Sequence, residues 1–123
     1  MTKQESSRHA DKYIKSDLAR ARLVTAAVAL EFGVPEIEVY SQTKGSSRSS
    51  FARQIAIYLT HVIFEINLSR VARTFNRDRS TASHACRVVE DSREDELIDQ
   101  KLLTLEAFLE RAPHPAPEFN HVP

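Results

Sequence analysis

The sequence is poor in several residues on which common protein classes depend. It has one cysteine, two glycines and no tryptophan among 123 residues. A single cysteine cannot form an intramolecular disulfide, so we expect a reducing compartment, the cytoplasm. With so few glycines there is no GxxxxGK[ST] and no GxGxxG motif, which excludes the common phosphate-binding loops of ATPases and dinucleotide enzymes. No apolar run approaches the ~18 residues that a membrane span needs, so we expect no membrane partner.

Length and composition indicate one folded domain with polar ends. A chain of 123 residues with 41% hydrophobic residues makes a single packed domain. Residues 1–15 are polar and lack the apolar stretch of a signal peptide, so we expect a flexible leader. Ser16 suits an N-cap and Asp17 the first turn of a helix, which places the domain at residues 16–112. Residues 113–123 contain four prolines, and we expect this tail to be disordered.

The charge is divided unevenly along the chain, although its formal sum is zero. Residues 41–87 hold eight basic residues against two acidic ones, a net +6. Residues 88–123 hold three basic residues against nine acidic ones, a net −6. Two interpretations stay open at this point: a solvated basic surface, or a surface that binds phosphate groups.

Apolar residues recur at helical spacing along the chain, and no useful stretch alternates at period two. The fold is therefore predicted to be all-α. Ile37 and Tyr40 are the expected inward residues of a short helical turn, and residues 41–50, SQTKGSSRSS, are expected to form a flexible basic loop. The longer helices are expected over residues 18–32, 51–66, 68–75 and 97–111, with another helix after Asp78.

Two of these helices carry clear apolar stripes. The stripe of the helix over residues 51–66 is expected to face the core. The stripe of the last helix has two interpretations, because it can pack on the domain's own core or form a seam with a second copy; we favour the core, and a monomer over a dimer. The first stripe is Phe51, Ile55, Tyr58, Leu59, Val62 and Ile66, and the second is Ile98, Leu102, Leu105 and Leu109.

Residues 67–78 predict a short helix followed by a tight turn. Asn67 is a good N-cap, and the apolar residues after it follow the i, i+3, i+4, i+7 spacing of one buried stripe. The chain then breaks at residues 76–78, and Asp78 is predicted to cap the next helix through its side-chain oxygen. The stripe consists of Leu68, Val71, Ala72 and Phe75.

The helix after this turn divides into a packing face and a polar face. Small apolar side chains let one face lie close to its neighbour, while the opposite face carries donors and cations. A short helix, a tight turn and such a second helix are typical of a helix-turn-helix, whose second helix enters the major groove of DNA. An ordinary helical hairpin with a basic face is the alternative. The packing face is Ala82, Ala85, Cys86 and Val89; the polar face is Ser80, Thr81, His84 and Arg87, flanked by Arg77 and Arg79.

Two stretches resemble the C-terminal DNA-binding domain of the bacterial replication initiator DnaA. Residues 51–60, FARQIAIYLT, are similar to the RQxAMYL helix of that family. Residues 67–90, NLSRVARTFNRDRSTASHACRVVE, are similar to its helix-turn-helix, including the Arg-Asp-His-Thr/Ser-Thr run that opens the recognition helix. The resemblance extends over about residues 20–108 and implies a domain of about six helices that recognises a short asymmetric duplex box.

The resemblance also implies roles for individual residues, carried over by position. Base edges in the major groove would face the start of the second helix, and a Leu-Pro pair of the family would lie at the groove edge. A basic loop residue would enter the minor groove, and further cations would hold phosphates. The base-reading set is Asp78, Arg79, Ser80, Thr81, Leu68 and Ser69; the minor-groove candidates are Lys44 and Arg48; the phosphate set is Arg53, Arg77, His84 and Arg87.

The sequence departs from the family at two of these positions and at one position in the turn. Arg79 stands where the family has His, Ser69 where it has Pro, and Asn76 where it has Gly. A change from His to Arg at a base-facing position replaces a small ring by a long fork that favours guanine. We therefore predict that this chain does not select the initiator's consensus box unchanged.

The expected function is sequence-specific binding of double-stranded DNA by a small regulator of transcription or of replication initiation. The segment before the resemblance is too short for the ATPase module of DnaA, so no ATP-dependent filament is expected. The alternative is a protein-interaction module that binds the initiator, a further candidate partner, or self-associates through its last helix. We expect no enzyme, because His84 and Cys86 lie two apart on a helix and point in different directions. No cofactor or metal is expected.

Overall fold

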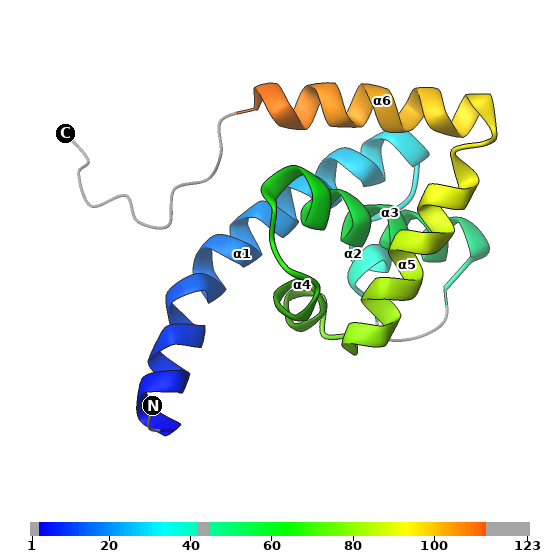
Figure 1. Ribbon diagram of the computed structural model, residues 1–123. Coiled ribbons are helices and arrows are strands. Elements are labelled where there is room, and N and C mark those ends of the chain that lie inside the picture. The colour runs from blue at the N-terminus through cyan, green and yellow to red at the C-terminus, as the bar shows by residue number, and fades with distance from the viewer. Residues whose placement is uncertain (1–2, 42–44, 113–123) are drawn as a thin grey trace.

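The computed structural model describes residues 3–41 and 45–112, and the side chains of its first helix from Tyr13 onward. These residues form six helices and no strand, which confirms the all-α prediction. Figure 1 shows the long first helix crossing the molecule, with the last helix lying over its C-terminal half. The helices are α1 (Lys3–Phe32), α2 (Glu36–Tyr40), α3 (Ser47–Phe64), α4 (Leu68–Thr74), α5 (Arg79–Ser92) and α6 (Glu96–Arg111).

The core is built around α3, which packs against each of the other five helices. Because α3 has neighbours on every side, residues 55–60 are all buried. This part of α3 is therefore buried on all its faces, and not only along the apolar stripe expected from the sequence. The prediction was wrong for one residue of the expected stripe, because Val62, near the end of α3, is 41% exposed. The helix ends at Glu65, which adopts the left-handed conformation with φ 52°.

The predicted start of the first helix was wrong. Instead of following a leader, α1 begins at Lys3, so Ser16 is not an N-cap but lies inside the helix. Ser16 and Asp17 are 3% and 1% exposed, and the Ser16 hydroxyl donates to the Tyr13 carbonyl at 3.2 Å. Asp17 suggested a helix start because its tertiary partner, Arg70 of α4, lies 53 positions away in the sequence.

The region from α2 to α3 also differs from the prediction. Ile37, expected to point inward, is 79% exposed, and Val39 is the buried residue of α2 instead. The second half of the predicted loop is the first turn of α3, because the Ser46 side chain caps the helix by accepting from the Ser49 amide at 3.1 Å. A helix of five residues has too few apolar positions for its periodicity to decide which one is inward.

The last helix packs on the domain itself, as predicted. Leu102, Leu105 and Leu109 are buried in the core, and Ile98 packs against it. The stripe is therefore occupied within this chain. Arg93 holds the start of α6 in place: its guanidinium is 2.6 Å from the Asp99 carboxylate and 2.8 Å from that of Glu106.

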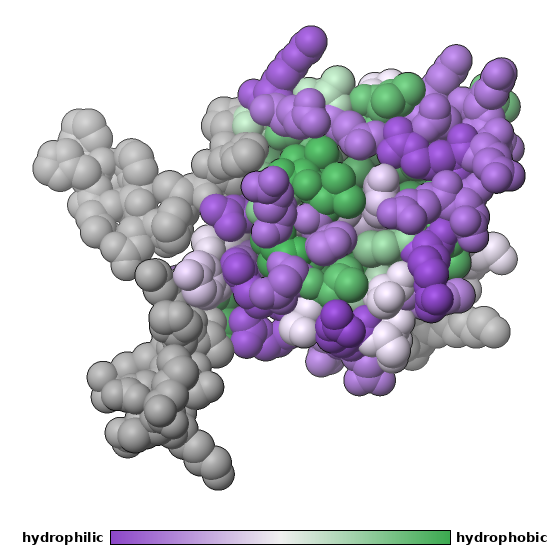
Figure 2. Space-filling model, viewed as in Figure 1, coloured by the Kyte–Doolittle hydropathy of each residue, from purple (hydrophilic) through white to green (hydrophobic). Residues whose placement is uncertain are grey.

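The surface is mixed in polarity. Figure 2 shows hydrophilic side chains over most of the visible face, with apolar patches between them. Several apolar side chains are exposed, among them Leu30 of α1 at 85% and Phe108 of α6 at 52%. Within the described residues, no helix combines the length and the apolar character needed to span a membrane.

Candidate nucleic-acid interface

The two helices α4 and α5 form the predicted helix-turn-helix. As predicted, Asn67 caps α4, and its side-chain oxygen accepts from the Arg70 amide at 2.9 Å. The helix stops at Phe75, and Asn76 turns the chain with φ 54°. This left-handed conformation suits Gly best, but Asn tolerates it better than most residues. Asn76 can therefore replace the Gly of the DnaA pattern without opening the turn.

The turn is closed by backbone hydrogen bonds of the kind that end helices. The Arg77 amide donates to the Ala72 carbonyl at 2.8 Å, and the Asn76 amide donates to the Arg73 carbonyl at 3.1 Å. These bonds satisfy carbonyls that would otherwise be left free at the end of α4. The angle between α4 and α5 is thus fixed locally.

The division of α5 into two faces is confirmed. Ala82, Ala85 and Val89 are buried against α3 and α4, and Cys86 is half-buried beside them. The small side chains on this face allow α5 to lie close to α3. The opposite face is solvent-exposed and carries Arg79, Ser80, Thr81, His84 and Arg87.

Asp78 occupies the N-cap position of α5, as predicted. In the part of the chain that the structure describes, however, its side chain does not accept the predicted hydrogen bond from the first turn of the helix. Its backbone is extended, with φ −73° and ψ 153°, and the side chain is exposed. The carboxylate therefore projects into solvent next to Arg79 at the start of the polar face. An acceptor at this place is suited to contact a base amino group, the role that the resemblance implies.

The turn between α4 and α5 rests against the end of α2. The Tyr40 ring stacks on Phe75, with ring centroids 6.0 Å apart and an interplanar angle of 17°. Arg77 Nη2 donates to the Ser41 carbonyl at 2.6 Å. Arg77, a candidate for phosphate binding, thus already holds a structural bond, which orients its half-buried side chain at the start of α5.

Arg53 has a structural role that the sequence did not suggest. Its Nε donates to the Val39 carbonyl and its Nη2 to the Glu38 carbonyl, both at 2.8 Å. Partial burial, and next the neighbouring charge of Arg77, lower the pKa of Arg53. Every helix leaves unpaired carbonyls at its C-terminus, and a short helix such as α2 needs donors for them. This requirement could have indicated from the sequence that a nearby cation such as Arg53 caps α2.

This geometry gives a test of the two roles of Arg53. We expect Arg53→Met to lower the free energy of unfolding by about 1–3 kcal/mol, because charged donors to backbone carbonyls are lost. The slope of log K against log salt for DNA binding should stay unchanged. Arg87→Met is the matched control and should show the reverse: unchanged stability, and a slope shallower by about 0.9 if one phosphate contact is lost. A shallower slope for Arg53→Met would restore the phosphate role.

The other candidates lie near the start of α3 and of α4. Arg48 is exposed in the first turn of α3, where Ser46 caps the helix and the buried Ser49 hydroxyl donates to the Glu38 carboxylate. Leu68 is half-buried and Ser69 exposed at the first turn of α4. Lys44 lies outside the described residues, so its place relative to Arg48 is not defined.

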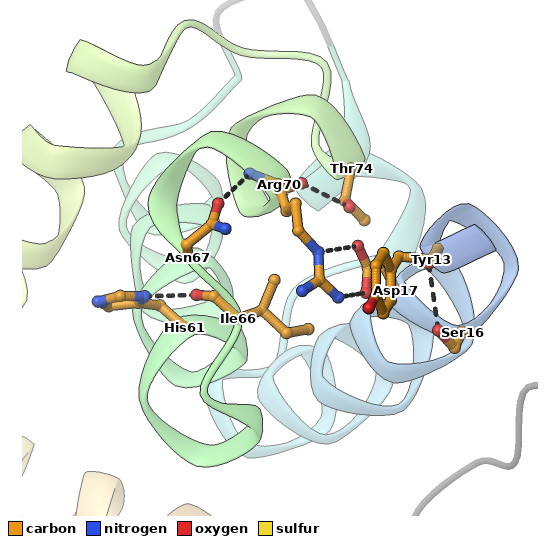
Figure 3. Close-up of polar contacts among 8 residues, drawn as sticks. All are labelled: Tyr13, Ser16, Asp17, His61, Ile66, Asn67, Arg70 and Thr74. Atoms are coloured by element: carbon orange, nitrogen blue, oxygen red, sulfur yellow. Dashed lines mark hydrogen bonds and ion pairs between the residues drawn. The ribbon is translucent and has the colours of Figure 1, made fainter. Parts of the chain in front are cut away.

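Arg70 was counted among the basic residues of the middle region, yet it points away from the polar face of α5. Figure 3 shows its side chain reaching from α4 to Asp17 on α1. The guanidinium binds the buried carboxylate through Nε at 3.0 Å and Nη2 at 2.6 Å. This hydrogen bond raises the pKa of Arg70. One of the eight basic charges is therefore neutralised inside the domain.

Cys86 is the free thiol of the chain, and burial raises its pKa, with Glu90 adding to the effect. Because the thiolate is the reactive form, we expect Cys86 to react about tenfold or more slowly with a thiol reagent than free cysteine at pH 8. The rate should rise with pH through a midpoint above that of free cysteine, and should rise sharply in denaturant. Rapid reaction of the folded protein would contradict this placement of the side chain.

Fold and surface together define a class: a helical DNA-binding domain of the helix-turn-helix type. The model of the bacterial DnaA protein helix-turn-helix family matches residues 21–89, more than half of the chain. The chain therefore belongs to the DnaA helix-turn-helix family, and a domain of this family implies DNA binding.

Individual relatives agree with this assignment. The chromosomal replication initiator protein DnaA of Thermoanaerobacter sp. (strain X514) is 26% identical over 102 residues, which is 80% of this chain and 23% of that protein. The DnaA protein of Aquifex aeolicus is 36% identical over 77 residues, 62% of this chain and 18% of that protein. A crystal structure of a DNA replication initiation factor matches 77% of this chain and 29% of its own chain, with a TM-score of 0.68 and 28% identity.

The chain thus spans less than a quarter of the length of these DnaA relatives. The shared part is the helix-turn-helix region, and the family that matches is defined by that region rather than by a catalytic domain. The predicted resemblance and the predicted fold are both confirmed.

Proposed function

We propose that this chain binds double-stranded DNA in a sequence-specific manner and acts as a small regulator of transcription or of replication initiation. The observation that carries the proposal is the exposed polar face at the start of α5, with its opposite face buried against α3 and α4. A recognition helix needs this arrangement, because only a firmly packed helix can present its N-terminal side chains to base edges.

In this proposal the residues divide into three groups according to the part of the DNA that they contact. The side chains at the start of α5 read base edges in the major groove, and the start of α4 lies at the groove edge. The first turn of α3 approaches the minor groove or a phosphate, and cations just before α5 and further along it hold phosphates. The base-reading group is Asp78, Arg79, Ser80, Thr81, Leu68 and Ser69. The group for the minor groove is Arg48 and Lys44, and the phosphate group is His84, Arg87 and Arg77.

The target sequence is proposed to differ from the initiator's own box. Arg79 is fully available for base contact, since it is exposed and lies at the first position of α5. A guanidinium there pairs bidentately with guanine O6 and N7, which a His ring cannot do. If the boxes overlap in part, the chain would compete or cooperate with the replication initiator at shared sites.

Selection of bound duplexes from a random pool tests the proposal. The selected duplex and a shuffled version are then compared by fluorescence anisotropy over a salt series. We expect a preference for the selected duplex and a steep fall of log K with log salt, at about 0.9 per phosphate contact. Absence of binding to either duplex at low salt would overturn the DNA-binding proposal, and recovery of the initiator's consensus unchanged would overturn the proposed role of Arg79.

A further inference from the structure

The contact between α1 and the seven-residue helix α4 is made by a buried carboxylate and a guanidinium. Asp17 is 1% exposed, and both its oxygens accept from Arg70, at 3.0 and 2.6 Å. A paired fork of this kind fixes the relative orientation of the two groups as well as their distance. The Arg70 guanidinium also lies over the Tyr13 ring, 4.2 Å from its centroid. Three side chains thus hold α4 on α1 (Figure 3).

The start of α4 is held from its other side as well. His61 Nδ1 lies 2.6 Å from the Ile66 carbonyl, which can only accept, so the imidazole donates. Next along the chain, the Asn67 side chain accepts from the Arg70 amide. The backbone of Arg70 is therefore fixed by the cap, and its side chain by Asp17. A helix this short has little stability of its own, so its orientation depends on such contacts.

The orientation of α4 contributes, together with the packing on α3, to how α5 is presented. α4 packs on α5 and on α3, and backbone hydrogen bonds close the turn at Asn76 that joins α4 to α5. Tyr13 and Asp17 lie before residue 21, where the match to the family model begins. The support for the helix-turn-helix therefore comes partly from a segment outside the matched family region.

We propose that Asp17 and Arg70 are positioning residues for DNA recognition, which fix α4, and through it α5, on the N-terminal half of α1. The proposal rests on the proposed DNA-binding function. Neither residue is assigned a contact with DNA. Their contribution is to sequence preference, because base contacts need side chains held within a fraction of an ångström, whereas phosphate attraction does not.

The test compares variants on the duplex that the wild-type chain selects and on its shuffled version. Asp17→Asn keeps the shape but removes the charge, and Arg70→Lys keeps the charge but removes the fork and the flat stacking surface. For both variants we expect the preference for the selected duplex to fall about tenfold, comparable with the loss of one base contact. All measurements are made at a temperature at which circular dichroism shows each variant to be folded.

Leu109→Ala is the matched control for stability. Leu109 is buried on α6, which packs mainly on α1 and α3, so the variant loses stability without changing Asp17, Arg70 or Tyr13. It should keep the wild-type preference. If Asp17→Asn and Arg70→Lys also keep it while their melting temperature falls, the pair is only structural and the proposal is overturned.

The outcomes separate the two proposals. A wild-type chain that prefers no sequence overturns the proposed function and this inference with it. A wild-type chain with a preference that both variants retain overturns the inference alone. If Asp17→Asn does not fold, Arg70→Lys decides: a lost preference supports the positioning role, and a retained one contradicts it.

Discussion

Replacing Arg79 by Ala is expected to remove about 1–3 kcal/mol of discrimination at one base pair of the target. Arg79 is exposed at the first position of α5, and its guanidinium makes no hydrogen bond or ion pair with any residue that the structure describes. Its loss should therefore change the free energy of unfolding by less than about 0.5 kcal/mol. Anisotropy with single-base variants of the selected duplex measures the effect, because only one position should lose its preference. Thr81→Ala should behave in the same way at a neighbouring position.

Arg87→Ala is the control for this prediction. Arg87 lies two turns further along the same exposed face and is assigned to phosphate, so its removal should weaken all duplexes alike. Arg79→His provides the complementary test, since it restores the residue of the DnaA pattern and should move the selected sequence towards the initiator's box. Equal losses on all sequences for Arg79→Ala, Thr81→Ala and Arg87→Ala would show that these roles are wrongly assigned.

Local patterns in the sequence predicted most of the architecture. The Asn67 cap, the break before Asp78, the two faces of α5 and the buried stripe of α6 all depend on spacing within one or two helical turns. Spacing of this kind can be read directly from the chain. The same holds for the family resemblance, because its motifs lie within the short segment from α3 to α5.

Several of the errors concern residues whose partners lie far away in the sequence. Asp17 looked like a residue at the start of a helix because its partner Arg70 could not be seen from local pattern. Arg53 and Arg77 were counted as free cations, although backbone carbonyls near the end of α2 accept from both. A charge count therefore overestimates the basic surface, since three of the eight positive residues are engaged inside the domain. The exposed cations on α5, together with Arg48 at the start of α3, are part of the charge pattern that remains for DNA.

The burial of α3 leads to the largest expected loss of stability. Leu59 is fully buried in the helix that contacts all the others, so Leu59→Ala should lower the free energy of unfolding by about 2–5 kcal/mol, through lost burial and the cavity left behind. For a domain of this size the melting temperature should fall by about 10–30 °C. Leu30→Ala is the matched control, because the same change at a side chain that is 85% exposed should have almost no effect. Thermal unfolding followed by circular dichroism distinguishes the two variants. Similar melting temperatures for both would mean that α3 is not the centre of the core, and then the support beneath α5 would have to come from elsewhere.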